Sequence, residues 1–257
     1  MLSVFLSLVF GALIGLTLGM VGGGGSILTV PILVYAIGQP AQQATTTSLA
    51  IVGLNALVGM AGHTRAHRVN LRLGLLFGLV GIGGALVGSW LNALVPGRVL
   101  LIAFAAVMLL AAGAMLRRRM PEQGDATADE GAGTIEWLKI IASGTVVGLM
   151  TGFFGVGGGF VIVPALVLVL GLSMRMAVGT SLLIIAMNSL WSLLAHLRFG
   201  RLDLGVTALF VLGGIAGALS GVHFAGRVPQ RRLTQGFAAL ITVVAGYILA
   251  RIYAGLR

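Results

Sequence analysis

The chain has 257 residues, of which 58% are hydrophobic and only 9% charged, and its mean hydropathy is +1.08. A water-soluble domain carries about 25% charged residues, so this chain lacks the polar side chains that would cover a globule. Its net charge of +10 comes from basic clusters between apolar stretches, a pattern typical of membrane orientation rather than of nucleic-acid binding. These properties predict a polytopic membrane protein, with the lipid bilayer and not nucleic acid as its partner.

Apolar segments follow one another along the whole chain, and a membrane crossing needs about 20 residues of helix. Those of the first half are Leu2–Val21, the short Ser26–Gly38, Ala44–Gly62, Leu73–Leu94 and Val99–Leu116. Those of the second half are Ile135–Phe154, the short Gly159–Gly171, Ala177–His196, Leu204–Ala225 and Leu233–Ile252. No basic residue precedes the first segment, which favours a retained span over a cleaved signal peptide. We therefore expect an all-α membrane protein of eight to ten helical segments.

The chain contains an internal duplication. A shift of 133 positions superposes the two halves without a gap from Gly15/Gly148 to Leu100/Leu233. The matches include polar pairs that shared membrane composition does not readily supply, namely Thr47/Thr180, Asn55/Asn188, His63/His196 and Arg65/Arg198. We therefore predict two pseudo-symmetric repeats, 1–116 and 135–257, joined by the polar linker 117–134.

The basic residues permit two orientations of the repeats. If the short segments do not cross the membrane the halves run parallel, and if they cross the halves are inverted. Either arrangement leaves eleven Lys and Arg on the linker side and five on the other, so the positive-inside rule predicts a cytoplasmic linker in both. The basic excess follows the third segment in the first half but the fourth in the second, and this opposite bias favours inverted repeats.

Each repeat carries a cluster of glycines followed by a proline, in Gly19–Pro31 and in Gly152–Pro164. Glycine costs a helix roughly 1 kcal/mol relative to Ala, and proline removes a backbone donor, so we expect both helices to break inside the membrane. A break in hydrocarbon is tolerated only where the backbone is buried in protein or lines a wet cavity. Two equivalent breaks therefore predict a cavity where the repeats meet.

Free N–H groups at helix starts after the glycines would favour a small anion as ligand. Hydroxyl and amide side chains on the following helix could donate to its oxygens without the cost of burying a charge. The candidate substrate-binding residues are Gly22, Gly24, Gly25, Ser26, Thr47, Ser48, Asn55, Gly155, Gly157, Gly158, Thr180, Ser181 and Asn188. Plainer roles compete, because glycine clusters also permit close helix packing and Ser and Thr also bond to their own helix.

The acidic residues also favour anionic cargo. Five of the six lie within 122–136, and only Asp203 lies elsewhere, whereas carriers of cations or protons usually place Asp or Glu in the membrane. Four residues near the span ends are candidates for a gate or a proton site: His63, His196, Arg65 and Arg198. An interfacial position is the plainer expectation for the two histidines, and a role in topology is the plainer one for the arginines.

Patterns that would indicate catalysis are absent from the sequence. There is no cysteine, no HExxH helix and no Gly-Lys-Ser/Thr after the glycines, and one acid outside 122–136 cannot build a paired-carboxylate site. We therefore expect no enzyme activity, no metal and no cofactor.

These motifs resemble the TauE/SafE sulfite exporter family, also called the four-toluene-sulfonate uptake permeases. The resemblance rests on the doubled G-x-x-x-G-x-x-G-x-G-G pattern (Gly15–Gly25, Gly148–Gly158), V-P-x-L, T-S-L and the paired asparagines. It implies transport of sulfite, sulfoacetate, thiosulfate or sulfonates across the bacterial inner membrane, with protons as a candidate coupling ion. The halves differ at Ser26/Gly159 and Thr46/Gly179, so the site is expected to be asymmetric.

Together these patterns predict a multi-pass secondary transporter of small sulfur-containing or organic anions, working by alternating access at the repeat interface. Two alternatives remain at this point. The first is an anion channel, whose flux would not saturate. The second is a non-transporting membrane subunit that packs against a partner.

Overall fold

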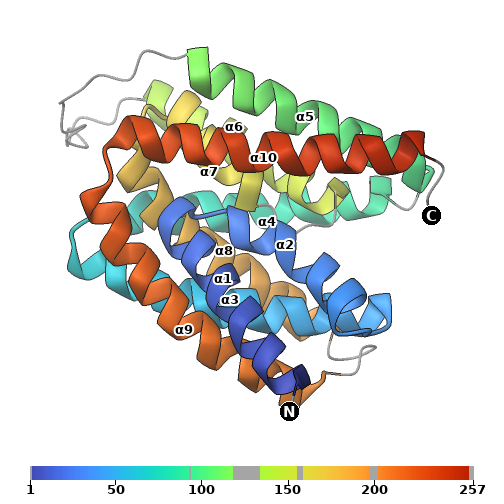
Figure 1. Cartoon of the computed structure of the whole chain (residues 1–257). Coiled ribbons are helices and arrows are strands. Elements are labelled where there is room, and N and C mark those ends of the chain that lie inside the picture. Colours follow the sequence, from blue (N-terminus) through green and yellow to red (C-terminus); the bar gives the residue numbers. More distant parts are fainter. Residues whose placement is uncertain (1, 93, 118–133, 155–158, 197–201, 255–257) are drawn as a thin grey trace.

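The structure is a computed structural model that describes residues 2–92, 94–117, 134–154, 159–196 and 202–254. Within these ranges all regular secondary structure is helical and no strand occurs (Figure 1). The predicted all-α class is therefore confirmed. Eight helices are long and apolar enough to cross a membrane, as expected for a polytopic protein.

The helices follow the predicted segments closely. In the first half they are α1 (Leu2–Val21), α2 (Gly24–Pro31), the π-helical η1 (Ile32–Ala36), α3 (Ala41–Arg65), α4 (Leu71–Asn92) and α5 (Gly97–Arg117). In the second half they are α6 (Thr134–Phe154), α7 (Gly159–Leu168), α8 (Met174–His196), α9 (Leu204–Arg227) and α10 (Gln230–Tyr253). Most of the linker, 118–133, lies outside the described residues.

The first glycine cluster ends one helix and begins another. Gly22 has a φ of +80°, a left-handed conformation that glycine adopts without steric cost, and its N–H donates to the Leu18 carbonyl at 2.8 Å. The chain then re-enters a helix at Gly24, and α2 passes into the wider π-helical turns directly after Pro31. The second cluster, 155–158, falls outside the described residues, between the end of α6 and the start of α7.

Each long helix of one half packs against a long helix of the other half. α1 packs along α9, and α4 packs along α6, so the first long helix of each half pairs with the third long helix of the other. α3 packs against α8 and α5 against α10, so these equivalent helices pair with each other. The pairing therefore ties the halves into one body.

Glycines form the seams of the two exchanged pairs. A Cβ atom at Gly15 would collide with the carbonyl of Gly214, and one at the equivalent Gly148 would collide with the carbonyl of Gly81. The equivalent contacts repeat further along both pairs. Small residues let helix backbones approach closely in a membrane, so these glycines are packing positions.

The order of these contacts gives the helix directions. Gly11, Gly15 and Gly19 meet Phe210, Gly214 and Ala218 in turn, so α1 and α9 run parallel. In contrast, Gly53 lies against Ser189 whereas Gly59 lies against Leu182, so α3 and α8 run antiparallel.

The helix ends gather at two poles. At the first pole α3 and α9 end and α4, α8 and α10 begin; the N–H of Met174 there donates to Oε1 of Gln230 at 3.2 Å. This pole lies at the left of Figure 1, where α5 also ends and α6 begins. At the opposite pole, Nε2 of Gln39 donates to Asp203 at 3.2 Å, and Asp203 caps α9 by accepting from the N–H of Val206.

Candidate functional site

His63 of α3 binds the end of α1 beside the glycine break. Its Nε2 lies 2.9 Å from the carbonyl oxygen of Gly19, in the last turn of α1, where carbonyls lose their helical partners. Because a carbonyl only accepts, Nε2 is the donor. His63 is fully buried within the protein, and its Nδ1 is buried with no partner in the described part of the chain.

Gly22, at the break itself, packs against the second repeat. A Cβ atom there would lie against Oγ of Ser181 and the backbone of Val178 in α8, and against the side chain of Val163 in α7. His63 from α3 and Ser181 from α8 therefore flank the end of α1. The first break therefore contacts α7 and α8 of the second half.

The predicted hydroxyl ligands are largely engaged. Ser48 donates to the carbonyl of Thr45 and Ser181 donates to that of Val178, both at 2.8 Å, so the two repeats make the same local bond. Oγ1 of Thr180 accepts from the N–H of Asn70 at 3.0 Å. The serine hydroxyl hydrogens are thus committed to their own helices, which is the plainer role considered for them.

Buried polar atoms without partners concentrate on α3 and the residues just before it. Oε1 of Gln39, Oγ1 of Thr47, both amide atoms of Asn55 and Nδ1 of His63 have no hydrogen-bond partner in the described residues. These residues recur every eight positions, which separates neighbours on α3 by about 12 Å along the helix and turns each about 80° around it from the one before. We call Gln39, Thr47, Asn55 and His63 the α3 polar file. Unpaired buried polar groups are costly and rare, so each needs a physical reason such as a ligand.

The second repeat places equivalent residues on α8. Thr180, Asn188 and His196 correspond to Thr47, Asn55 and His63, and α8 runs antiparallel to α3. The contacts of Gly53 and Gly59 put the two asparagines at one level, with His63 near the level of Thr180. Asn188 is only half-buried whereas Asn55 is fully buried, so the two equivalent asparagines differ in their surroundings.

The other candidate residues either permit close helix packing or lie outside the described residues. A Cβ at Gly24 would meet Leu240, and one at Gly25 would meet the backbone of Ile14, so both glycines permit close packing. Arg65 is exposed at the first pole. Outside the described residues lie Gly155, Gly157, Gly158 and Arg198, as do the side chains of Ser26 and His196.

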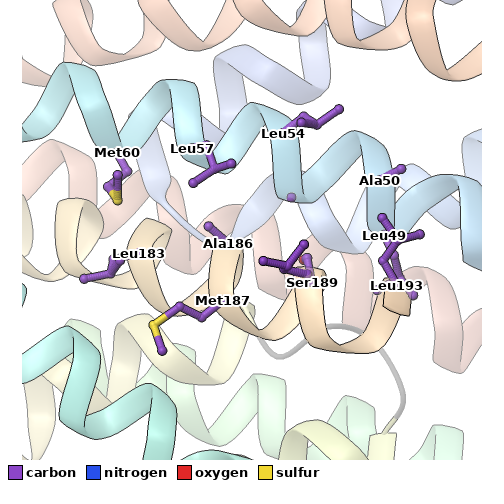
Figure 2. Close-up of a pocket in the computed structure, with 12 residues that line it drawn as sticks. Leu49, Ala50, Leu54, Leu57, Met60, Leu183, Ala186, Met187, Ser189 and Leu193 are labelled. Carbon is purple, nitrogen blue, oxygen red and sulfur yellow. The ribbon is translucent and has the colours of Figure 1, made fainter. Parts of the chain in front are cut away.

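A groove between α3 and α8, on the side of α3 away from Asn55, is apolar. It has a volume of about 180 Å³ and is lined by side chains such as Leu54, Leu57, Leu183 and Met187, with Ser189 as its polar residue (Figure 2). Leu54 and Leu57 are about half exposed, whereas the neighbouring Asn55 is fully buried. The face of α3 that carries Leu54 and Leu57 is therefore apolar and turned outward, and this groove does not suit an anion.

Sequence reasoning identified Thr47, Asn55 and His63 singly but missed their common spacing. The signal was present, because Thr, Asn and His recur at intervals of eight in both repeats. It also missed the carbonyl of Gly19 as the partner of His63, since that contact depends on how α1 and α3 pack.

The apolar helices, the broken first helix and the enclosed polar file are features of a polytopic membrane transporter. Comparison with known proteins agrees. Residues 7–248 match the family model "Sulfite exporter TauE/SafE", and the chain therefore belongs to the TauE/SafE family.

Similar proteins come from bacteria and archaea. A "Probable membrane transporter protein" of Xylella fastidiosa (strain 9a5c) is 34% identical over 96% of this chain and 95% of its own length. "Probable membrane transporter protein YdhB" of Bacillus subtilis is 26% identical over 92% and 96%, and MJ0441 of Methanocaldococcus jannaschii is 20% identical over 95% and 94%. No solved structure matches the chain.

Proposed function

We propose that this protein is a secondary transporter that carries small sulfur-containing or organic anions, of the sulfite, sulfoacetate, thiosulfate or sulfonate type, across the bacterial inner membrane. The observation that carries the proposal is the α3 polar file, in which buried donors and acceptors lack protein partners. The family's printed name, sulfite exporter, supports this substrate class and a transport role rather than catalysis.

The middle of the path in this proposal is Asn55, and Asn188 lies at the same level on α8. The Asn55 amide lies against Gly214, whose other side packs on Gly15 of α1. Asn55 therefore sits where α1, α3 and α9 meet, at the interface of the two halves. An amide N–H at this position can donate to an anionic oxygen, while the surrounding helices exclude water.

The helix directions support inverted repeats. Two halves related by an axis along the membrane normal would run equivalent helices parallel, whereas α3 and α8 run antiparallel. Binding residues near the middle of the membrane, between inverted halves, suit alternating access, in which the two poles open in turn.

The charges support a cytoplasmic position for the first pole. Described basic residues of both halves lie there, among them Arg68 and Arg72 after α3 and Arg175 and Arg227 at the ends of α8 and α9. The positive-inside rule then puts the linker in the cytoplasm.

The test is uptake of sulfite, sulfoacetate and thiosulfate into proteoliposomes that contain the purified protein. Wild-type uptake should saturate and show trans-stimulation, and Asn55→Leu should lower the initial rate by about tenfold or more, since a lost hydrogen bond to a charged group costs about 1.5–3 kcal/mol. Asn188→Leu should have a smaller effect, because Asn188 is half-buried.

Gln235→Leu is the matched control, because it removes an exposed amide from α10, away from the polar file. Thermal unfolding in detergent checks that each variant is folded. Uptake by folded Asn55→Leu protein at the wild-type rate would remove Asn55 from the path. Flux that neither saturates nor shows trans-stimulation would identify a channel instead.

A further inference from the structure

Two arginine side chains meet at the first pole around the last turn of α9. Nη1 and Nη2 of Arg68 lie 3.0 and 2.9 Å from the position that a Cβ atom would take at Gly226. Arg175, in the first turn of α8, donates from Nη2 to the carbonyls of Gly226 at 3.3 Å and Val228 at 3.2 Å. The two guanidinium groups therefore approach the same glycine from two places, the turn between α3 and α4 and the start of α8.

The backbone holds Arg68 in this place. α3 ends in a Schellman arrangement, in which the N–H of Arg68 bonds to the carbonyl of His63 at 2.9 Å and that of His67 bonds to Thr64 at 3.0 Å. The carbonyl of Arg68 then packs on Gly179 of α8, where a Cβ atom would collide with it. This contact explains why the second repeat has glycine where the first has Thr46.

The two positive charges have no carboxylate partner among the described side chains. Asp203 lies at the opposite pole, bonded to Gln39. Burial and the neighbouring charge of Arg175 lower the pKa of Arg68. Nε of Arg175 is also buried without a partner in the described part. Arg175 therefore has this Nε–H donor in addition to the Nη2 group that bonds to the carbonyls at the end of α9.

The pair lies close to the proposed transport path. Thr180 and Ser181 follow Arg175 on α8 by five and six residues, or about 8 and 9 Å along the helix. Ser181 contacts the break at Gly22, and the carbonyl of His63 accepts from Arg68. An anion between the arginines would thus stand at the cytoplasmic end of the α3 polar file.

We propose that Arg68 and Arg175 form an oxyanion-binding site at the cytoplasmic mouth of the transport path, which takes sulfite-like or sulfonate anions before or after they pass Asn55. This inference rests on the proposed function and deepens it. Planar guanidinium groups match the paired oxygens of such anions. A phospholipid headgroup presents the same oxyanion chemistry, so the test must separate a free anion from a lipid.

The test is thermal stabilisation of the full-length protein in lipid-free detergent, titrated with sulfite, thiosulfate or sulfate at constant ionic strength set with chloride. Arg68→Gln and Arg175→Gln should each weaken the apparent Kd by about tenfold, as expected for loss of a charge-assisted hydrogen bond. Arg231→Gln, which removes an exposed charge from the same pole, should leave the Kd unchanged.

Gly226→Ala gives an independent variant that changes no charge. Its Cβ would displace the Arg68 guanidinium, and alanine favours the helix, so the protein should fold and bind the anion more weakly. This variant keeps the proposal testable even where Arg175→Gln destabilises the end of α9. A Kd in Gly226→Ala and Arg68→Gln equal to that of Arg231→Gln overturns the site.

A second titration with phosphatidylglycerol separates the sources of the anion. Stabilisation by the lipid alone, lost in Arg68→Gln, would overturn a substrate site and identify a lipid site instead. Proteoliposome uptake separates the two proposals. Saturable uptake with unchanged KM in both arginine variants refutes the mouth site and leaves the transporter. Anion binding that needs both arginines, without any uptake by the wild type, refutes the transporter and leaves the site.

Discussion

Among single residues, His63 has a different role for each of its two ring nitrogens. Its Nε2 hydrogen is committed to the Gly19 carbonyl, which stabilises the end of a helix that stops inside the protein. In the neutral ring Nδ1 is then the free base, and it is buried without a partner in the described residues. We propose that a coupling proton, if transport uses one, binds at this nitrogen.

Substitutions at His63 should separate the two roles. His63→Gln keeps an N–H donor for Gly19 and removes the basic nitrogen, whereas His63→Leu removes both. Leaving the buried carbonyl unpaired should cost His63→Leu about 1–3 kcal/mol of stability, and His63→Gln should lose less. Thermal unfolding in detergent measures this difference.

His63→Gln also tests whether Nδ1 binds the coupling proton. Uptake driven by a pH gradient should be lost in His63→Gln, although the protein remains folded. Thr64→Val is a suitable control, because Thr64 is exposed on the same helical turn and its hydroxyl bonds only to the Met60 carbonyl. Uptake that still responds to the gradient in His63→Gln would place the coupling site elsewhere.

Among the helices, the glycines serve two different purposes. Gly22 is needed for a left-handed backbone at the break. Gly15, Gly84 and Gly148 are needed because another helix backbone occupies the place of a side chain. Sequence reasoning could predict the break from the glycines and proline, but it could not assign the packing glycines to partners. That assignment depends on the exchange of α4 and α9 between the halves.

Two adjacent glycines of α4 provide a matched test of the seam. A Cβ at Gly84 would collide with the Thr145 carbonyl of α6, whereas one at Gly83 would meet nothing within 4 Å. Gly84→Ala should therefore destabilise the protein by about 1–3 kcal/mol through overpacking. Gly83→Ala should be neutral or stabilise it by up to about 1 kcal/mol, because alanine favours a helix.

Thermal unfolding of the two variants in the same detergent makes the comparison. The second repeat already carries alanine, Ala216, at the position that corresponds to Gly83. Equal stability of the two variants would show that α4 and α6 are not packed as closely as described.

For the whole molecule, periodicity and composition determined much of the fold in advance. Predicted Leu2–Val21 coincides with α1, whereas α3 extends its prediction by about one turn at each end and α8 begins about one turn early. The duplication found Asn55 and His63 without a structure. What could not be predicted is the antiparallel pairing of α3 and α8, since hydrophobic periodicity carries no information about partners. The basic residues of the sequence therefore favour inverted repeats but do not reveal which helices pair.

The inverted arrangement makes a direct prediction for the two ends of α10. Pro229 lies at the first pole and Tyr253 at the opposite end, and both are exposed. The chain has no cysteine, so Pro229→Cys and Tyr253→Cys each introduce a unique thiol. In intact cells a membrane-impermeant maleimide should label Tyr253→Cys, and it should label Pro229→Cys only after permeabilisation.

Ala66→Cys serves as the internal reference, because Ala66 is exposed and the positive-inside rule predicts a cytoplasmic loop after α3 in both arrangements. Parallel halves would reverse the two α10 labels and leave that of Ala66→Cys unchanged. Such a reversal would also move Arg175 and Arg227 away from the cytoplasm, and with them the proposed cytoplasmic mouth. The labelling of one helix therefore decides both the symmetry of the repeats and the side from which the arginine pair meets its anion.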